Sequence, residues 1–505
     1  MSDYKLNVKR TILVGFAFFL ISAFWQAYDA IIPLALTNHF GLPQTISGAV
    51  MSLDNILAVF MLPIFGALSD KVSTRFGKRT PFIVIGTVAA ILAFIALTFI
   101  DTYQLSVVKN SGIPEWYEAT KLLESTTKDL LSAAKEAGDT AAIAIHEAEL
   151  ARLADVYESI RETTLDLTLN NLGVIIGFIG VLLLVLIAMA TFRSPAVALM
   201  PDVTVKPLRS KGNAIINLMG TAGGIAVLVL GILFKTSSNL FMKYTAYVIA
   251  VCLIMAVGLI VFILTVKEKK WAAEMEADSI KFGIEESNPD IKTEARKLTR
   301  PEIISLLLIL ASVALWYIGY NSITSKYSVY ATNILGFDYN ATLIVAQAAA
   351  VVSYIPVGII ASKVGRKKTI LAGVLILAAA FFIGNFITAD TNPLVMFPVF
   401  ALAGIGWATI NVNSFPMVVE LAKGGEVGKY TGYYYTASMA AQIVAPILSG
   451  ALYDIFGMRA MFFSFGTAFV LFSFVTMLFV KHGNAQDLDG KTAKEMIADN
   501  FASED

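Results

Sequence analysis

The chain has 505 residues, of which 57% are hydrophobic and 15% charged, and its mean hydropathy is +0.71. The formal net charge is zero, which gives neither the basic surface of a nucleic-acid-binding protein nor an acidic tail for a basic partner. The single cysteine, Cys252, excludes a disulfide framework and a cysteine-rich metal site.

Apolar runs of about 20 residues or more, long enough to cross a hydrocarbon core, recur along the chain. The first run is too long for a signal-peptide core and lacks a cleavage pattern, so we expect it to remain as a transmembrane helix. The pattern predicts an all-α integral membrane protein with twelve spans. They lie at residues 11–36, 46–68, 81–100, 169–198, 212–234, 245–266, 301–331, 340–361, 369–388, 394–420, 430–453 and 460–480.

Lysine and arginine gather in the short connections on one side of these spans. They are Lys5, Lys9 and Arg10, then Lys71, Arg75, Lys78 and Arg79, then Lys206, Arg209 and Lys211, then Lys363, Arg366, Lys367 and Lys368. By the positive-inside rule this side is cytoplasmic, and so are both termini and the charged linker 267–300. The polar tail 481–505 is expected to be a mobile end or a short surface helix. We expect a multi-pass protein of a plasma or inner membrane.

Residues 101–168, between the third and fourth spans, break the pattern with thirteen acids and six bases. Their apolar residues recur at roughly helical spacing on both sides of a Gly138-Asp139 turn, which predicts an extracellular helical hairpin. The charges of so long a translocated segment do not count in the orientation rule.

An internal repeat divides the spans into two sets of six. Residues 66–79 resemble residues 358–367 at an offset of 292, and the same offset aligns Asp29 with Asn321. Beyond the outer segment the offset falls to 218, and the loss of 74 residues is close to the 68 residues of that segment. The expected organisation is a first half (1–100 and 169–266) with an insertion (101–168), a linker (267–300), a second half (301–480) and a tail (481–505).

The loop after the second span contains Ser69-Asp70, Ser73-Thr74-Arg75-Phe76-Gly77-Lys78-Arg79 and Pro81-Phe82-Ile83. A twelve-helix chain with Gly-x-x-x-Asp-(Lys/Arg) and Gly-Lys-Arg in this loop resembles the major facilitator superfamily. More narrowly, the loop is similar to the signature of the sucrose/proton symporters and the wider glycoside-pentoside-hexuronide carriers. Residues 194–202 are similar to the Gly-Pro-x-Arg-Ala-Leu-x-x-Asp motif of the same branch. The resemblance covers both halves but not the insertion, and it implies transport of a sugar with protons.

The sequence also departs from that branch. Val197 stands where the plant sucrose carriers place the arginine of the fourth-span motif, and Arg193, one helical turn earlier, is the nearest cation. Leu186 stands where they have an aspartate. The two aspartates of a sodium-coupled melibiose carrier correspond to Ala58 and Leu62, which makes sodium coupling the weaker hypothesis.

Asp29 and Asp54 are the candidates for proton coupling, because carboxylates at membrane depth are costly and usually functional. At 1.5 Å per residue each lies about 10 to 12 Å below the outer surface, on consecutive antiparallel helices. If both face one cavity, desolvation and repulsion favour a shared proton. The structural alternatives are that Asp29 caps a helix break before Pro33 and that Asp54 bonds to backbone at a wet helix end.

A sugar needs aromatic faces for its C–H surfaces and amides or charged groups for its hydroxyls. Any one of these aromatic residues could instead be an interfacial anchor or part of helix packing, and Arg193 could extend to the interface. The repeat gives the charged residues to the first half and the amides to the second, which suggests that the first half handles the proton. The candidate substrate-binding residues are Trp25, Gln26, Tyr28, Asn55, Arg193, Asn217, Trp316, Tyr320, Asn321, Gln347, Trp407, Asn411 and Gln442.

Charged residues on the cytoplasmic side are expected to form a network that closes the inner face in the outward-open state. The candidate gating residues are Asp70, Arg75, Arg79 and Asp202 in the first half, with Lys363, Arg366 and Glu420 as a weaker copy in the second. The alternative for the lysines is simple solvation.

The expected function is proton-coupled uptake of a disaccharide or glucoside, such as sucrose or maltose, by alternating access. A proton-driven exporter of amphipathic compounds is the first alternative, and a non-transporting receptor that uses the insertion is the second. No catalytic triad order, phosphate loop or metal cluster is present, so we expect no enzyme activity, no cofactor and no metal. The expected partners are the sugar, protons and the lipid bilayer, with no nucleic acid, and the protein is expected to be a monomer.

Overall fold

The computed structural model describes residues 6–205, 208–281, 298–421 and 427–483. The regular elements of these residues are all helical, and twelve helices are long and apolar enough to span a membrane, which confirms the predicted fold class. The candidate spans are Val8–His39, Gln44–Lys71, Thr80–Asn110, Leu172–Asp202, Lys211–Leu233, Thr245–Thr265, Arg300–Leu335, Tyr339–Ala361, Arg366–Gly384, Pro393–Val418, Lys429–Phe456 and Met458–Leu478. The predicted tail beyond Gly483 lies outside the described residues.

The first half contains six spans. They are α1 (Val8–Leu34) with η1 (Ala35–His39), α2 (Gln44–Met51) with α3 (Leu53–Lys71), α4 (Thr80–Asn110), α7 (Leu172–Asp202), α8 (Arg209–Leu233) and α9 (Thr245–Thr265). The helix α10 (Glu268–Lys281) follows them.

The second half repeats the arrangement. Its elements are α11 (Arg300–Thr324) with α12 (Tyr327–Val329) and η3 (Tyr330–Leu335), α13 (Tyr339–Val364), α14 (Arg366–Gly384), η4 (Pro393–Val395) with α15 (Met396–Val419), α16 (Val427–Phe456) and α17 (Met458–Leu478). In each half the first span ends in a π-helical turn, η1 or η3. Asn38 of η1 and Asn333 of η3 exchange two amide hydrogen bonds, of 3.3 and 2.6 Å, across the boundary between the halves.

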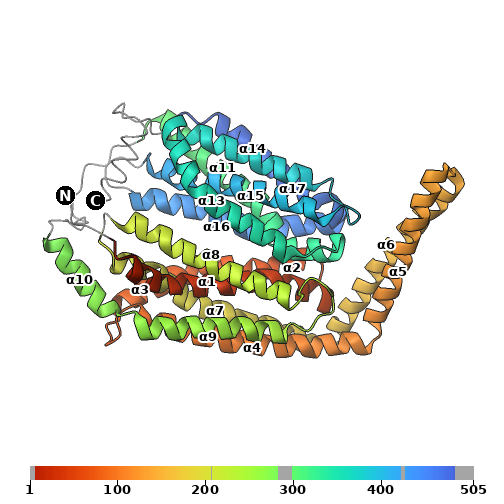
Figure 1. Ribbon diagram of the computed structural model, residues 1–505, viewed down its shortest axis with the longest axis horizontal. Helices are drawn as coiled ribbons and strands as arrows, with labels where there is room; N and C mark the ends of the chain where they lie inside the picture. The colour runs from red at the N-terminus through yellow and green to blue at the C-terminus, as the bar shows by residue number, and fades with distance from the viewer. Residues whose placement is uncertain (1–5, 206–207, 282–297, 422–426, 484–505) are drawn as a thin grey trace.

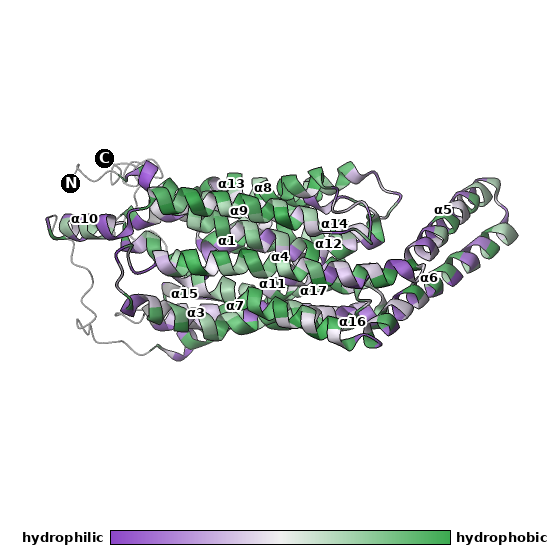
Figure 2. Ribbon diagram, turned by 90° about the horizontal axis from the view of Figure 1, so that it is seen from below, coloured by the Kyte–Doolittle hydropathy of each residue, from purple (hydrophilic) through white to green (hydrophobic). Residues whose placement is uncertain are grey.

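The two halves lie side by side as two layers of helices (Figure 1). Within the first half α1 packs on α8 and α9, and α4 packs on α7; within the second, α15 packs on α13 and α14, and α11 packs on α17. The halves meet where α2 contacts α16 and where α8 contacts α13. Figure 2 shows that apolar residues cover the bundle, as lipid-facing helices require.

A helical hairpin projects from one end of the bundle (Figures 1 and 2). It consists of α5 (Ile113–Ala137) and α6 (Thr140–Leu169), joined at Gly138, whose φ of +69° suits glycine, and at Asp139, which caps α6 by accepting hydrogen bonds from two backbone N–H groups. The hairpin around Gly138-Asp139 was predicted correctly. However, α4 continues to Asn110, so residues 101–110 extend the third span.

Two names are used below. The hairpin end is the end of the bundle from which α5 and α6 project, and the signature end is the opposite end, which contains the loop between α3 and α4.

Candidate functional site

A cavity of about 1050 Å³ lies between the two halves. Its walls come from α1, α7 and α8 of the first half and from α11, α12, α13, α14, α15 and α17 of the second. Ala214, near the start of α8, lines it on the side of the signature end. Toward the hairpin end its lining includes Phe463, near the start of α17, and the rings of Tyr327 and Phe400, which pack with centroids 4.4 Å apart.

The first-half wall is charged. The Asp29 side chain is open to the cavity, and Arg193 lines the same space with its guanidinium 5.6 Å from the centre of the Trp25 ring. Asp54 is half-buried beside the cavity and accepts a 2.7 Å hydrogen bond from the Asn55 amide. Asp29, Asp54 and Arg193 interact electrostatically with one another, so the predicted pair of carboxylates shares one environment with a cation.

The second-half wall is neutral and aromatic. The rings of Tyr320 and Trp407 stack in parallel with centroids 3.7 Å apart, and the edge of Tyr317 meets Trp407 at 5.2 Å. Asn321 lines the cavity and donates a 2.8 Å hydrogen bond to the Tyr317 carbonyl. These groups offer a flat apolar surface next to an amide, which is the combination that binds a sugar ring.

A hydrogen bond between two lining side chains joins the halves across the cavity. The Gln347 amide donates to the Gln26 side-chain carbonyl at 2.6 Å, and both side chains line the space. Asn217 also lines it, with its amide donating to the Asn213 carbonyl at 2.9 Å.

Five predicted substrate-binding residues do not line the cavity. Tyr28 and Trp316 are fully buried in helix packing. The Asn55 amide donates to the Asp54 carboxylate, and the Gln442 amide donates to the Ser438 carbonyl at 3.2 Å. Asn411 is half-buried beside the lining residue Val412.

Sequence reasoning missed several lining residues. Tyr354 lies seven residues after Gln347, two turns along the same face of α13, and this spacing was a signal that could have found it. Tyr327 and Ser328 lie at the break between α11 and α12, where hydropathy carries no signal.

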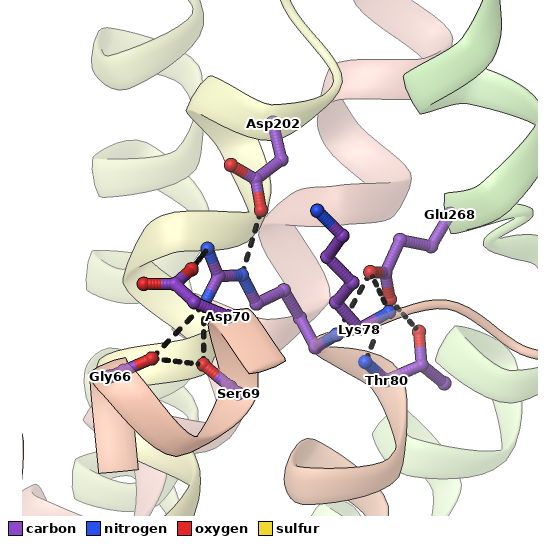
Figure 3. A network of polar contacts seen from close by, with 8 residues as sticks. Gly66, Ser69, Asp70, Lys78, Thr80, Asp202 and Glu268 are labelled. Atoms are coloured by element: carbon purple, nitrogen blue, oxygen red, sulfur yellow. Dashed lines mark hydrogen bonds and ion pairs between the residues drawn. The ribbon is translucent and has the colours of Figure 1, made fainter. Parts of the chain in front are cut away.

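The loop between α3 and α4 is organised by Arg79, whose partners Ser69, Asp70 and Asp202 are labelled in Figure 3. The Arg79 guanidinium donates to Asp202 at 2.7 Å, to Asp70 at 2.5 Å and to the Ser69 hydroxyl. Burial alone lowers the pKa of Arg79, but its hydrogen bonds to Asp202 and Asp70 outweigh burial and raise the pKa. The guanidinium therefore stays charged and holds the ends of α3 and α7 together.

Glu268 of α10 is a further partner of this loop, and sequence reasoning missed it. Its carboxylate accepts from the backbone N–H groups of Lys78, Arg79 and Thr80 at 2.5 to 2.8 Å, and so caps the start of α4 (Figure 3). Arg75, which was predicted to join the network, instead lies over the Phe76 ring at 4.6 Å.

The second-half copy of this network is smaller. Arg366 donates to Glu420 at 3.3 Å and to the Pro416 carbonyl at 3.4 Å, and Lys363 is exposed. Both networks lie within their own halves. Among the described residues no three His, Cys, Asp or Glu side chains are placed to hold a metal ion.

Comparison with known proteins agrees with this architecture. The profile of the Major Facilitator Superfamily matches residues 167–408 and 342–499, and the MFS/sugar transport protein profile matches residues 13–107. The MFS-type transporter ppzB of Metarhizium rileyi is 29% identical over 125 residues, and the match spans a quarter of each chain.

Solved structures share the fold at low sequence identity. The inward-open xylose transporter XylE from E. coli is similar with a TM-score of 0.57 and 14% identity, over 97% of this chain and 99% of that one. A POT family transporter in complex with 5-aminolevulinic acid gives a TM-score of 0.59 and 10% identity, over 94% and 96% of the two chains. From its fold and the profile match over more than half of its length, the chain belongs to the Major Facilitator Superfamily, whose members are membrane transporters and not enzymes.

Proposed function

We propose that this protein carries a sugar into the cell together with protons, by alternating access, as the sucrose/proton symporters and related glycoside carriers do. The cargo is a disaccharide or glucoside such as sucrose or maltose. The observation that carries the proposal is a cavity between the halves with a charged first-half wall and an aromatic, amide-bearing second-half wall. Its volume of about 1050 Å³ is at the upper end of small-molecule sites.

The charged wall gives protons a role. Asp29, Asp54 and Arg193 together carry one net negative charge when both carboxylates are ionised, and none when one carboxylate takes up a proton. Enclosing a neutral cluster away from water costs less than enclosing a charged one. Protonation therefore favours closure around a neutral cargo, which is the basis of symport.

The neutral wall gives the cargo its place. A pyranose ring stacks its C–H face on the Trp407 and Tyr320 pair, and its hydroxyls replace the hydrogen bonds of Asn321 and of the Gln26–Gln347 pair. Because Gln26 and Gln347 belong to different halves, a sugar between them bonds to both.

Sidedness follows from the positive-inside rule. The signature end, with Arg79 and Arg366, is cytoplasmic, and the hairpin end is extracellular. The halves meet at the hairpin end, and the cavity reaches Ala214 near the signature end, so we infer that the structure represents the inward-open state of the carrier. The Arg79 and Arg366 networks are proposed to brace the cytoplasmic helix ends of each half, and the protein acts as a monomer in a plasma or inner membrane.

Uptake into proteoliposomes tests the proposal. Radiolabelled sucrose and maltose are offered to the purified protein with and without an inward proton gradient. We expect accumulation above equilibrium only with the gradient, and counterflow without it. Equal uptake after the gradient is collapsed would rule out proton symport, and failure of counterflow for all disaccharides and glucosides would rule out the cargo class.

One observation favours an exporter of amphipathic compounds, because the cavity is also lined by Phe18, Phe381, Phe400 and Phe463. The Gln26→Ala variant separates the two functions. A sugar carrier loses affinity when this amide is removed, whereas export of an amphipathic dye does not depend on it.

A further inference from the structure

The base of the hairpin comprises Gln104 of α4 with Arg161 and Thr168 of α6. It contacts the turn at residues 39–41, where the first span ends. Three successive backbone carbonyls of this turn accept hydrogen bonds from side chains of α4 and α6. His39 accepts from the Gln104 amide at 3.0 Å, Phe40 from the Thr168 hydroxyl at 2.9 Å, and Gly41 from the Arg161 guanidinium at 3.2 Å.

These contacts are buried and closely packed. The side chains of His39 and Gln104 are fully buried, and the His39 ring lies 2.7 Å from the Asp101 carboxylate. Gly41 has a φ of +66°, and a Cβ atom there would lie 2.5 Å from the Leu165 backbone nitrogen. Residue 41 must therefore be glycine for α6 to reach the turn.

The same turn leads directly into α2, which the other half caps. Pro43 stands at the N-cap position without a side-chain hydrogen bond. The Asp454 carboxylate of α16 instead accepts from the backbone N–H groups of Gln44 and Thr45, at 2.7 and 2.8 Å, and from the Thr45 hydroxyl at 2.6 Å. A carboxylate at a helix N-terminus is favoured by the unpaired N–H groups and the helix dipole.

Further contacts close this junction between the halves. The fully buried Lys326 of the second half donates to the Ser47 hydroxyl at 2.5 Å. Cβ atoms added at Gly48 or Gly450 would collide with the backbone of the opposite helix, at Pro446 and Gln44 respectively. Arg161 interacts most strongly with its neighbour Glu158 and also electrostatically with Asp454.

We propose that the base of the hairpin braces the gate at this end of the cavity, where the gate is the junction of α2 with α16. By fixing residues 39–41 it presents the α2 N-terminus to Asp454 of the other half. The insertion therefore stabilises the state that is closed at the hairpin end, although it lies outside the cavity. The inference rests on the alternating access of the proposed function, but on no particular cargo.

Distances between spin labels on opposite sides of the hairpin end measure how far the gate is open, and the measurement needs no substrate. The labels are placed by Lys243→Cys and Ala389→Cys, two exposed positions in different halves, in a full-length Cys252→Ser background. The brace variants are Thr168→Val and Arg161→Met. Asp454→Asn serves as the positive control for opening, and Lys135→Met at the hairpin tip, which removes an ion pair with Glu147, is the matched control.

We expect the brace variants to increase the population with long label distances at least threefold, in the same direction as Asp454→Asn, whereas Lys135→Met matches the parent protein. An unchanged distribution in Thr168→Val, with Asp454→Asn opening the gate, would overturn the proposal. Opening in the Lys135→Met control would also overturn it, because the effect would not be specific to the base.

Hydrogen exchange at the Gln44 and Thr45 amides gives a second readout, which separates loss of the brace from general destabilisation. The brace variants should exchange these amides faster while the α14–α15 contact keeps its protection. Faster exchange throughout the bundle would overturn the proposal. If Arg161→Met does not fold, Thr168→Val alone decides, since it replaces one hydroxyl by a methyl group of the same shape. A protein that fails to transport sugars still gives both readouts.

Discussion

The two halves share a helix order but differ in what they place on the cavity. The first half exposes Asp29 and Arg193, and the second exposes Tyr320, Asn321 and Trp407. Asn321 occupies the repeat position of Asp29, so one side-chain oxygen has become an amide nitrogen. The two copies of a duplicated scaffold can therefore take different roles in transport. One copy keeps the titratable groups, and the other keeps the uncharged surface.

The largest expected effect tests the charged half. Asp29→Asn should abolish accumulation driven by a proton gradient, by about 100-fold or more, because Asp54 and Arg193 alone form a neutral cluster that can be enclosed without taking up a proton. Sucrose counterflow at equal pH should persist. Uptake assays in proteoliposomes measure both rates.

The control for Asp29→Asn is Asn321→Ala at the matching position of the second half. It should weaken sugar binding but leave the dependence on the proton gradient. If Asp29→Asn kept gradient-driven accumulation, the proposed dependence of closure on the net charge of Asp29, Asp54 and Arg193 would be wrong.

The next effect compares the arginines of the two networks. Arg79 has 8% side-chain exposure and bonds to two carboxylates, whereas Arg366 is 29% exposed and bonds to one. Arg79→Ala should destabilise the protein by about 2 to 3 kcal/mol, since it leaves Asp202 and Asp70 without their cation. Arg366→Ala should cost less than about 1 kcal/mol.

Thermal unfolding of both arginine variants in one detergent measures the difference. Equal losses of stability would contradict the view that the first-half network braces its helices more strongly than the second-half network does.

A smaller effect tests the neutral half. Trp407→Ala should weaken sugar binding about tenfold, or about 1.4 kcal/mol, because it removes aromatic surface from the cavity and the ring on which Tyr320 stacks. Trp407→Phe should recover part of the affinity. Both should keep the parent's dependence of uptake on pH, and a change in that dependence would show that the walls do not work separately.

The hairpin, which has no counterpart in the second half, gives the smallest effect. Burial alone raises the pKa of Glu124, but hydrogen bonds from Lys128 and Tyr157 outweigh it and lower the pKa from its ordinary value of 4.5. A carboxyl group whose pKa is lower in the folded than in the unfolded protein stabilises the fold fully at pH values above the unfolded pKa. This contribution is lost as the pH falls through the folded-state pKa. Glu124→Gln should therefore cost about 0.5 kcal/mol at pH 7 and less near pH 4. Thermal unfolding at the two pH values checks the trend, and an equal cost at both would contradict it.

Much of the fold could be predicted because its signals are local. Span lengths follow from hydropathy, and the hairpin turn follows from Gly138 and Asp139. Part of the cavity was also predictable, since Trp25, Asp29 and Gln347 are polar or aromatic residues within apolar runs.

The residues that could not be assigned from the sequence depend on the direction of a side chain around its helix and on contacts between residues far apart in the chain. Tyr28 is adjacent to Asp29 but points about 100° around the helix, where it packs against Phe24. Glu268 reaches the start of α4 from 188 residues away, and no local pattern records that contact.

The continuity of α4 has a practical consequence. Because it is one helix from Thr80 to Asn110, the hairpin joined to it follows the orientation of the first half. α5 extends over 25 residues, about 37 Å, beyond the lipid-embedded mass. In single-particle electron microscopy that arm is a built-in fiducial for aligning a small carrier in a micelle. Its tilt against the second half reports the rocking motion in each image class.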